Sequence, residues 1–407
     1  MLGLLVSSSF IAQGTTAPPS FSEGYLPSME KIELSTPDMN DLFAEADKFE
    51  QEEGRTMNGK IIYENFSPTT HGNWSTLSDG SSIWRLQLHA QDAMSVAAYF
   101  SNFHLPIGSS LWIYNSDKTY FEGPIDHIEN NDHGLYVTND MWGEDIVLEY
   151  HQPVNVVGEP KLEINGLGYF FRYVYPPAAL MAERGGSQAC EVNVNCPEGE
   201  HWQFQRDAVV RIRITDSGVT FLCSGSMVNT TALDCRQYLL SALHCADGVS
   251  DSDLLLLQVR FNYERPWADI DEDGQPEWEE CGTGGFSSAH NRTGVFRLAD
   301  SNDNGGGGFS GSDFILLEVE DEIQAAWTPY FAGWDASGGG SATGVGIHHP
   351  AGDIKKISTY TSSLQSVWLG APGSHWEVEW VETTTNHGVT EGGSSGSPIF
   401  NSDKLVV

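Results

Sequence analysis

Along most of the chain, hydrophobic and polar residues alternate with a period of two. Trp84, Leu86 and Leu88 alternate with Arg85 and Gln87, which is typical of a strand that buries one face. Other short strands are predicted at residues 94–100, 110–114, 144–150 and 162–174. Turn residues separate these segments, and the spacing favours a β-sandwich over residues 59–175.

The second half of the chain repeats the strand pattern, and one earlier segment shows a helical period. The later strands are predicted at residues 208–214, 220–228, 237–243, 254–263, 314–319, 344–348 and 376–381. The helix is predicted to begin near Pro37, a residue suited to the first turn, and to end at Gly54. We therefore expect an all-β protein in which a sandwich precedes a barrel-like unit.

The sequence is strongly acidic. Its 407 residues include 56 Asp and Glu against 20 Lys and Arg, which gives a formal net charge of −36. A surface with this charge repels a phosphate backbone, so nucleic acid is excluded as a partner. No internal stretch of about 18 apolar residues occurs, so no membrane span is predicted.

Residues 176–187, rich in Pro and Gly, form a predicted junction between the two β units. The six cysteines all follow it, at positions 190, 196, 223, 235, 245 and 281. This clustering predicts disulfides and an oxidising compartment. Residues 1–12 are mostly apolar and resemble the end of a secretory signal, so we expect export to the extracellular space or the periplasm.

Three local motifs carry candidate chemistry. His244 ends a predicted buried strand, Asp313 opens another, and Ser395 lies in a turn rich in Gly and Ser. A serine hydroxyl needs a base within hydrogen-bond reach, a histidine can take its proton, and a carboxylate can orient that histidine. Glycines around Ser395 allow the amides of Gly393 and Ser395 to point to one spot, as an oxyanion hole requires. Each motif alone is weak, but their order along an all-β chain is specific.

With these motifs, the chain resembles the trypsin/chymotrypsin superfamily of serine endopeptidases, in its bacterial lysyl-endopeptidase-like branch. The segments that carry the resemblance are residues 190–199, 223–226, 240–245, 312–317, 331–335, 347–350, 389–391 and 393–398. Ser394 stands where trypsin-like enzymes usually have Asp, and Ser397 where they usually have Gly. The resemblance extends over nearly all of residues 185–407, and residues 59–175 resemble, more weakly, the pro-region of the same enzymes.

The resemblance implies a sandwich-like pro-domain followed by a chymotrypsin-like double β-barrel. It implies that His244 is the general base, Asp313 orients it and Ser395 is the nucleophile. The amides of Gly393 and Ser395 would form the oxyanion hole, and catalysis would need no cofactor. The expected domains are a signal segment at 1–12, a pro-region at 13–184 and a protease domain at 185–407, with a cut between Arg184 and Gly185.

The same resemblance bears on the cysteines. A Cys223–Cys245 bridge would brace the loop that carries His244, and Cys196 would pair with Cys281. The pairing of Cys190 and Cys235 stays open: they could bridge each other, or Cys190 could pair with a cysteine outside this sequence.

One acidic loop fits the calcium-binding spacing D-x-D-x-D-G-x5-E. The oxygen ligands would come from Asp269, Asp271, Asp273, Gln275 and Glu280. A solvated acidic loop is the alternative, because Pro276 and the lack of flanking helical patterns depart from an EF-hand. Bound Ca²⁺ would be structural and would offset the crowded negative charge.

Two adjacent histidines, His348 and His349, also allow two interpretations. They could bind a metal together. The strand period of two instead predicts one histidine facing inward and one facing outward.

The sequence predicts a secreted, zymogen-type serine endopeptidase that cleaves protein or peptide substrates after Lys or Arg. Two alternatives stay open: a catalytically silent binding protein with a protease fold, and a periplasmic quality-control protease of the same superfamily. The preference for Lys or Arg rests on the resemblance and on Arg184. The sequence ends at Val407, twelve residues after Ser395, so we expect an incomplete second barrel and an incomplete substrate pocket.

Overall fold

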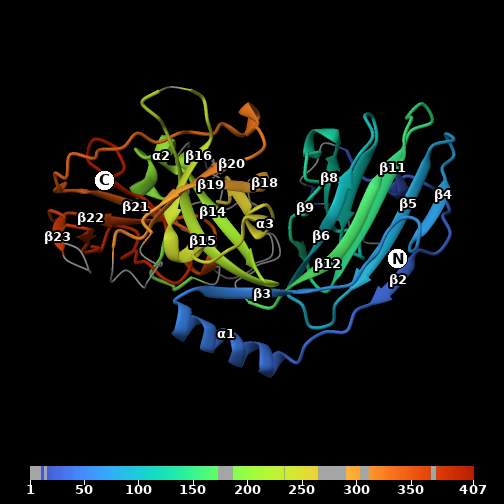
Figure 1. The fold of residues 1–407 in the computed structure, drawn as a ribbon, viewed down its shortest axis with the longest axis horizontal. Helices are drawn as coiled ribbons and strands as arrows, with labels where there is room; N and C mark the ends of the chain where they lie inside the picture. The colour runs from blue at the N-terminus through green and yellow to red at the C-terminus, as the bar shows by residue number, and fades with distance from the viewer. Residues whose placement is uncertain are drawn as a thin grey trace, which may run out of the picture. The chain divides into compact units, whose positions relative to one another are not determined.

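The computed structural model describes residues 11–12, 16–172, 187–232, 234–264, 290–302, 311–367 and 373–407. Strands dominate these residues, which confirms the predicted all-β fold (Figure 1). None of the described helices has the length and hydropathy that crossing a membrane requires. Contacts divide the chain into a first unit, residues 1–39 and 60–171, and a second unit, residues 40–59 and 172–407.

The described residues of the first unit form two β-sheets. One has the strand order β1-β8-β7-β11-β5-β2, with β4 beside β5, and the other has the order β10-β6-β12, with β9 beside β6. Their bounds are β1 (Ile11–Ala12), β2 (Glu30–Glu33), β4 (Asn73–Thr76), β5 (Ser82–His89), β6 (Ser95–His104), β7 (Ser110–Tyr114), β8 (Tyr120–Ile125), β9 (Tyr136–Val137), β10 (Met141–Trp142), β11 (Asp145–Gln152) and β12 (Lys161–Phe170). Two 3-10 helices, η1 (Pro19–Phe21) and η2 (His127–Glu129), lie between them in sequence. Strands β6 and β11 of the two sheets contact each other, as in a sandwich.

Strand β5 differs from its prediction in one respect. Trp84, Leu86 and Leu88 are fully buried, as the alternation indicates, but Arg85 is buried too. Its guanidinium donates a hydrogen bond to the carbonyl oxygen of Pro27, so an earlier segment of the chain covers the second face. The period of two identified the strand correctly and missed the burial of its polar side.

The described residues of the second unit form two main hydrophobic cores, and the larger one is surrounded by the strands β18-β17-β14-β15-β16-β20-β19 in that order. These are β14 (Val209–Asp216), β15 (Val219–Val228), β16 (Tyr238–Ala242), β17 (Gln258–Phe261), β18 (His290–Thr293), β19 (Val295–Asp300) and β20 (Phe314–Val319). No ladder joins β18 to β19, but the chain passes from one to the other through Gly294 alone. The sheet is therefore not closed by hydrogen bonds, although its first and last strands follow each other directly in the chain.

The second core lies on an open four-stranded sheet with the order β13-β22-β21-β25. Its strands are β13 (Val192–Asn193), β21 (Gly344–His348), β22 (Lys356–Tyr360) and β25 (Ile399–Asn401), and β23 (Gln365–Val367) pairs separately with β24 (His375–Glu377). The remaining elements are α1 (Met39–Glu53), β3 (Thr56–Ile62), α2 (Gln203–Ala208), α3 (Asp251–Leu254), η4 (Pro197–Gly199), η5 (Leu243–Cys245), η6 (Ala325–Trp327) and η7 (Pro350–Gly352).

Two predicted strands are shorter than expected. The apolar run at residues 254–263 begins as the end of α3, because the Ser250 hydroxyl accepts the amide of Asp253 and so caps a helix. Strand β17 consequently starts only at Gln258. Of residues 376–381, only the first two belong to a strand.

Residues 40–59 belong to the second unit, which also carries the three candidate motifs. Helix α1 lies where the sequence predicts it. The ring centroids of Phe49 and Phe221 are 4.8 Å apart, and Arg55 forms an ion pair of 3.2 Å with Asp216. The structural division therefore does not coincide with the predicted cut after residue 184.

Candidate active site

Paired strands bring His244 and Asp313 to the same edge of a sheet. His244 follows β16, and Asp313 precedes β20. These strands are antiparallel, with Ala242 opposite Phe314. Antiparallel pairing puts the end of one strand beside the start of the other, so two residues far apart in sequence come into contact.

Asp313 holds His244 through two hydrogen bonds. Its Oδ2 lies 2.6 Å from the ring Nδ1, and its Oδ1 accepts the His244 backbone N–H at 2.8 Å. A carboxylate at Nδ1 favours the tautomer in which Nδ1 carries the hydrogen, so Nε2 keeps a lone pair that can take a proton. The two side chains are 20% and 15% exposed, which leaves the ring accessible while shielding the pair from most of the solvent.

Ser395 lies in a tight turn between Glu391 and Ser397. The Ser394 amide donates to the Glu391 carbonyl at 3.0 Å, and the Ser397 amide donates to the Ser394 carbonyl at 3.0 Å. Gly393 has a φ of 91°, and a side chain there would come within 3.0 Å of the His349 carbonyl oxygen. Both the backbone conformation and the available space therefore require glycine at this position.

The carbonyl groups of this turn are fixed, whereas two of its amides are free. The Gly392 carbonyl accepts the Ala351 amide at 2.6 Å. Ser224 donates its hydroxyl to the Gly393 carbonyl at 2.9 Å and its amide to the Ser395 carbonyl at 2.8 Å. The amides of Gly393 and Ser395 donate to no other described residue. Two unoccupied N–H groups on a rigid turn can stabilise a developing negative charge.

The Cys223–Cys245 disulfide connects β15 to the residue that follows His244, which confirms this sequence prediction. The Cys245 Sγ also lies 3.8 Å from the carbonyl oxygen of Ser395. The bridge therefore contacts both the segment of His244 and the segment of Ser395. Cys190 and Cys235, whose pairing the sequence left open, are free thiols.

Replacing both Cys223 and Cys245 with Ala is expected to lower the free energy of unfolding by about 3 kcal/mol, because the bridge closes a loop with a sequence separation of 22. Urea unfolding measures the change. Cys235→Ala removes an exposed free thiol and is the matched control, with little expected effect. A double variant as stable as the control would contradict the prediction.

Several predicted site residues fall outside the described residues. Cys196 is disulfide-bonded, but its predicted partner, Cys281, is not described. The loop at residues 269–280 and the predicted cut between Arg184 and Gly185 also lie outside these ranges. They stay predictions. Within the described ranges, no group of three or more His, Cys, Asp or Glu is arranged to hold a metal ion.

His348 and His349 correct one sequence prediction, because both are fully buried instead of one facing outward. Strand β21 ends at His348 and the chain then turns, so the alternation does not extend to His349. The His348 Nδ1 lies 2.8 Å from Ser394 Oγ, and the His349 amide donates to Ser224 Oγ at 2.9 Å. Both histidines therefore support the turn of Ser395. Ser224 is the further site residue that sequence reasoning missed.

A histidine oriented by a carboxylate, beside a turn with two free amides, can take the proton of a serine hydroxyl, so that the serine oxygen accepts an acyl group from a substrate. On an all-β unit with two cores, such a site defines a trypsin-like serine endopeptidase. Comparison with known proteins gives the family. Residues 184–406 match the family model described as "Lysyl endopeptidase, C-terminal domain", and the chain belongs to this family.

Individual relatives agree with the family assignment to different degrees. A lysyl endopeptidase of Pseudomonas aeruginosa is 26% identical over 338 residues, which cover 80% of this chain and 67% of that protein. Among solved structures, the HtrA-type protease AlgW with tripeptide is 12% identical with a TM-score of 0.30, covering 50% of this chain and 52% of that one. Deg5 is 13% identical with a TM-score of 0.30, covering 51% of this chain and 79% of that one.

Proposed function

We propose that this chain is a secreted endopeptidase, made as a precursor, that hydrolyses peptide bonds after Lys or Arg. Ser395 is the nucleophile, His244 the general base and Asp313 the residue that orients it. The observation that carries this proposal is the 2.6 Å contact between Asp313 and the His244 ring, next to a turn whose Gly393 and Ser395 amides are unoccupied. Secretion is supported by the Cys223–Cys245 disulfide, since such bonds persist in oxidising compartments.

In the proposed reaction, Nε2 of His244 takes the hydroxyl proton of Ser395 as its oxygen attacks the substrate carbonyl carbon. Negative charge moves to the carbonyl oxygen, to which the amides of Gly393 and Ser395 donate hydrogen bonds. Asp313 stabilises the imidazolium, which then gives its proton to the leaving amine. Water attacks the acyl-enzyme by the same route and restores the Ser395 hydroxyl.

The preference for a basic residue before the scissile bond is supported by the family. The matching family model and the Pseudomonas relative both carry the name lysyl endopeptidase. Arg184 precedes the predicted cut, so removal of the pro-region would itself follow a basic residue. The net charge of −36 also favours the approach of basic substrate segments.

Three peptides that differ only in carrying Lys, Arg or Gln before the scissile bond test this preference. We expect kcat/KM to be at least about 30-fold lower for the Gln peptide, because losing a charge-assisted hydrogen bond costs about 2 kcal/mol. Mass spectrometry of the products gives the position of each cut, and initial rates give kcat/KM. Equal rates for all three peptides would contradict a preference for basic residues.

A further inference from the structure

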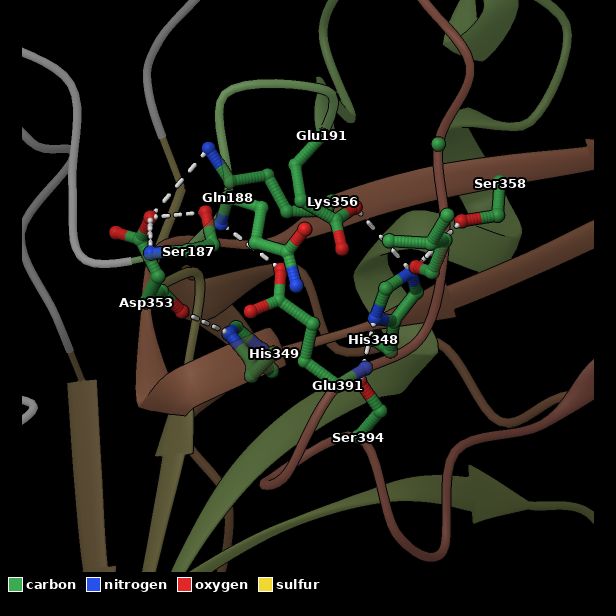
Figure 2. A network of polar contacts seen from close by, with 12 residues as sticks. Ser187, Gln188, Glu191, His348, His349, Asp353, Lys356, Ser358, Glu391 and Ser394 are labelled. Carbon is green, nitrogen blue, oxygen red and sulfur yellow. Dashed lines mark hydrogen bonds and ion pairs between the residues drawn. The ribbon is translucent and has the colours of Figure 1, made fainter. Parts of the chain in front are cut away.

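The first described residues after the predicted cut run along the segment that leads to Ser395. The Gln188 amide donates to Oε1 of Glu391 at 2.9 Å, and the Gly388 amide donates to the Cys190 carbonyl at 2.9 Å. Figure 2 shows the side chains that fill the space between these segments. Glu191, which directly follows Cys190, is one of them.

The side chain of Glu191 places a carboxyl group in the space between these two segments. Its side chain is 1% exposed, and neither of its carboxyl oxygens has a hydrogen-bond partner among the described residues. The nearest ring nitrogen is Nε2 of His348, at 4.0 Å (Figure 2). An ionised carboxylate in such a place would bear a large, uncompensated desolvation cost.

The surrounding titratable groups do not neutralise Glu191. Burial lowers the pKa of His348 to about 3, so its ring is uncharged. The Lys356 ammonium is 3.5 Å from Asp353 and donates to another side chain. The last neighbour, Glu391, is itself an acid. Burial first, and then the interaction with Glu391, raises the pKa of Glu191 to about 9, against the smaller opposing effect of Lys356.

We propose that Glu191 is a positioning residue for the turn of Ser395. Its carboxyl group is protonated and, through a small movement of either side chain, donates to the neighbouring Glu391 carboxylate a hydrogen bond that the structure itself does not record. Two facing acids in a buried site share one proton, because both cannot ionise there. The backbone of Glu391 opens the turn: its amide donates to Ser394 Oγ at 3.1 Å, and its carbonyl accepts the Ser394 amide at 3.0 Å. Fixing Glu391 therefore fixes the direction of the amides that follow.

The proton on the Glu191 carboxyl group should make both the stability and the activity of the protein depend on pH. The pKa of Glu191 rises from an ordinary 4.5 to about 9 on folding, so between these values the folded chain binds one proton more than the unfolded chain. The resulting stabilisation is complete below about pH 4.5 and is lost as the pH rises through about 9. Once both acids are ionised they repel each other, and the turn loses its fixed geometry. We expect kcat to fall at the alkaline pH where both acids are ionised, and KM to change less.

Glu191→Gln tests the proposal, because the amide keeps the size and the donor but cannot ionise. The variant is expected to keep kcat at pH 7 and to lose the alkaline fall in kcat that the unmodified protein shows near pH 9. Glu200→Gln makes the same substitution at an exposed position and should keep the fall. Glu191→Ala, which has no donor, should lower kcat at pH 7 by more than KM changes. If the Ala and Gln variants have equal kcat at pH 7, the positioning role is overturned.

A second measurement does not depend on activity. In a Ser395→Ala background, urea unfolding between pH 5 and pH 10 should show a decline in stability with pH that Glu191→Gln removes and Glu200→Gln retains. An identical pH dependence with and without Glu191→Gln would overturn the shared proton. The inference about kcat rests on the proposed role of Ser395. A protein that shows the proton linkage but hydrolyses no peptide would count against the proposed function alone.

Discussion

Ser395→Ala is expected to lower kcat by about 10⁶-fold, since a proton-accepting histidine is of no use without the hydroxyl it activates. The turn itself should survive the change, because its carbonyls are held through backbone atoms and through Ser224, and Gly393 keeps its φ of 91°. KM is therefore expected to change little. If the precursor cuts itself, this variant should also stay intact at the Arg184–Gly185 bond.

Ser402→Ala is the matched control, because Ser402 is exposed and lies seven residues further along the chain. A covalent serine-directed probe should label the unmodified protein and the control, but not Ser395→Ala. Full labelling of Ser395→Ala would show that another hydroxyl is the nucleophile. If the unmodified protein takes no label and cleaves no peptide, the catalytically silent alternative is favoured instead.

Asp313→Asn should have the second largest effect, a fall in kcat of about 10⁴-fold. In the unmodified protein, the His244 backbone N–H donates to Oδ1 of Asp313 at 2.8 Å. The side-chain oxygen of Asn can accept the same hydrogen bond, so the fold should persist. It places an amide in front of the ring Nδ1 in place of the carboxylate oxygen at 2.6 Å, which favours the wrong tautomer and removes the charge that stabilises the imidazolium.

Steady-state hydrolysis of the Lys peptide near neutral pH measures this change, and circular dichroism checks the fold. Asp403→Asn removes an exposed carboxylate from the same unit and should leave kcat unchanged. A loss of less than tenfold for Asp313→Asn, with an intact fold, would contradict the role of this carboxylate.

The sequence was informative where a local pattern carries the chemistry. Strand patterns identified β14, β15, β16, β17 and β20 around the larger core but missed β18 and β19. The strand-end positions of His244 and Asp313 followed from these patterns. The neighbours in sequence of Ser395 are glycines and small residues, which indicate a tight turn. These local patterns did not by themselves pair the cysteines, and the Cys223–Cys245 bridge was predicted from the family resemblance.

Patterns failed where long-range packing decides the environment of a side chain. Arg85 alternates with apolar residues and so looks exposed, yet a distant segment covers it. His349 looks like the outward member of a strand, yet the chain turns there and buries it. Glu191 lies between a cysteine and a valine and resembles any surface acid. Its burial depends on β21 and β22, more than 150 residues away in sequence.

The packing of residues 40–59 changes what a backbone cut can achieve. Phe49 stacks near Phe221, and Thr56 is so close to Gly392 that a side chain at Gly392 would come within 2.5 Å of its hydroxyl. If the chain is cut after Arg184, as proposed, this packing would stay in place. The cut would convert an intramolecular association into a complex of two chains, whose population depends on a dissociation constant and on dilution. The cut and the departure of the leader would thus be separate events, and dilution would favour the second.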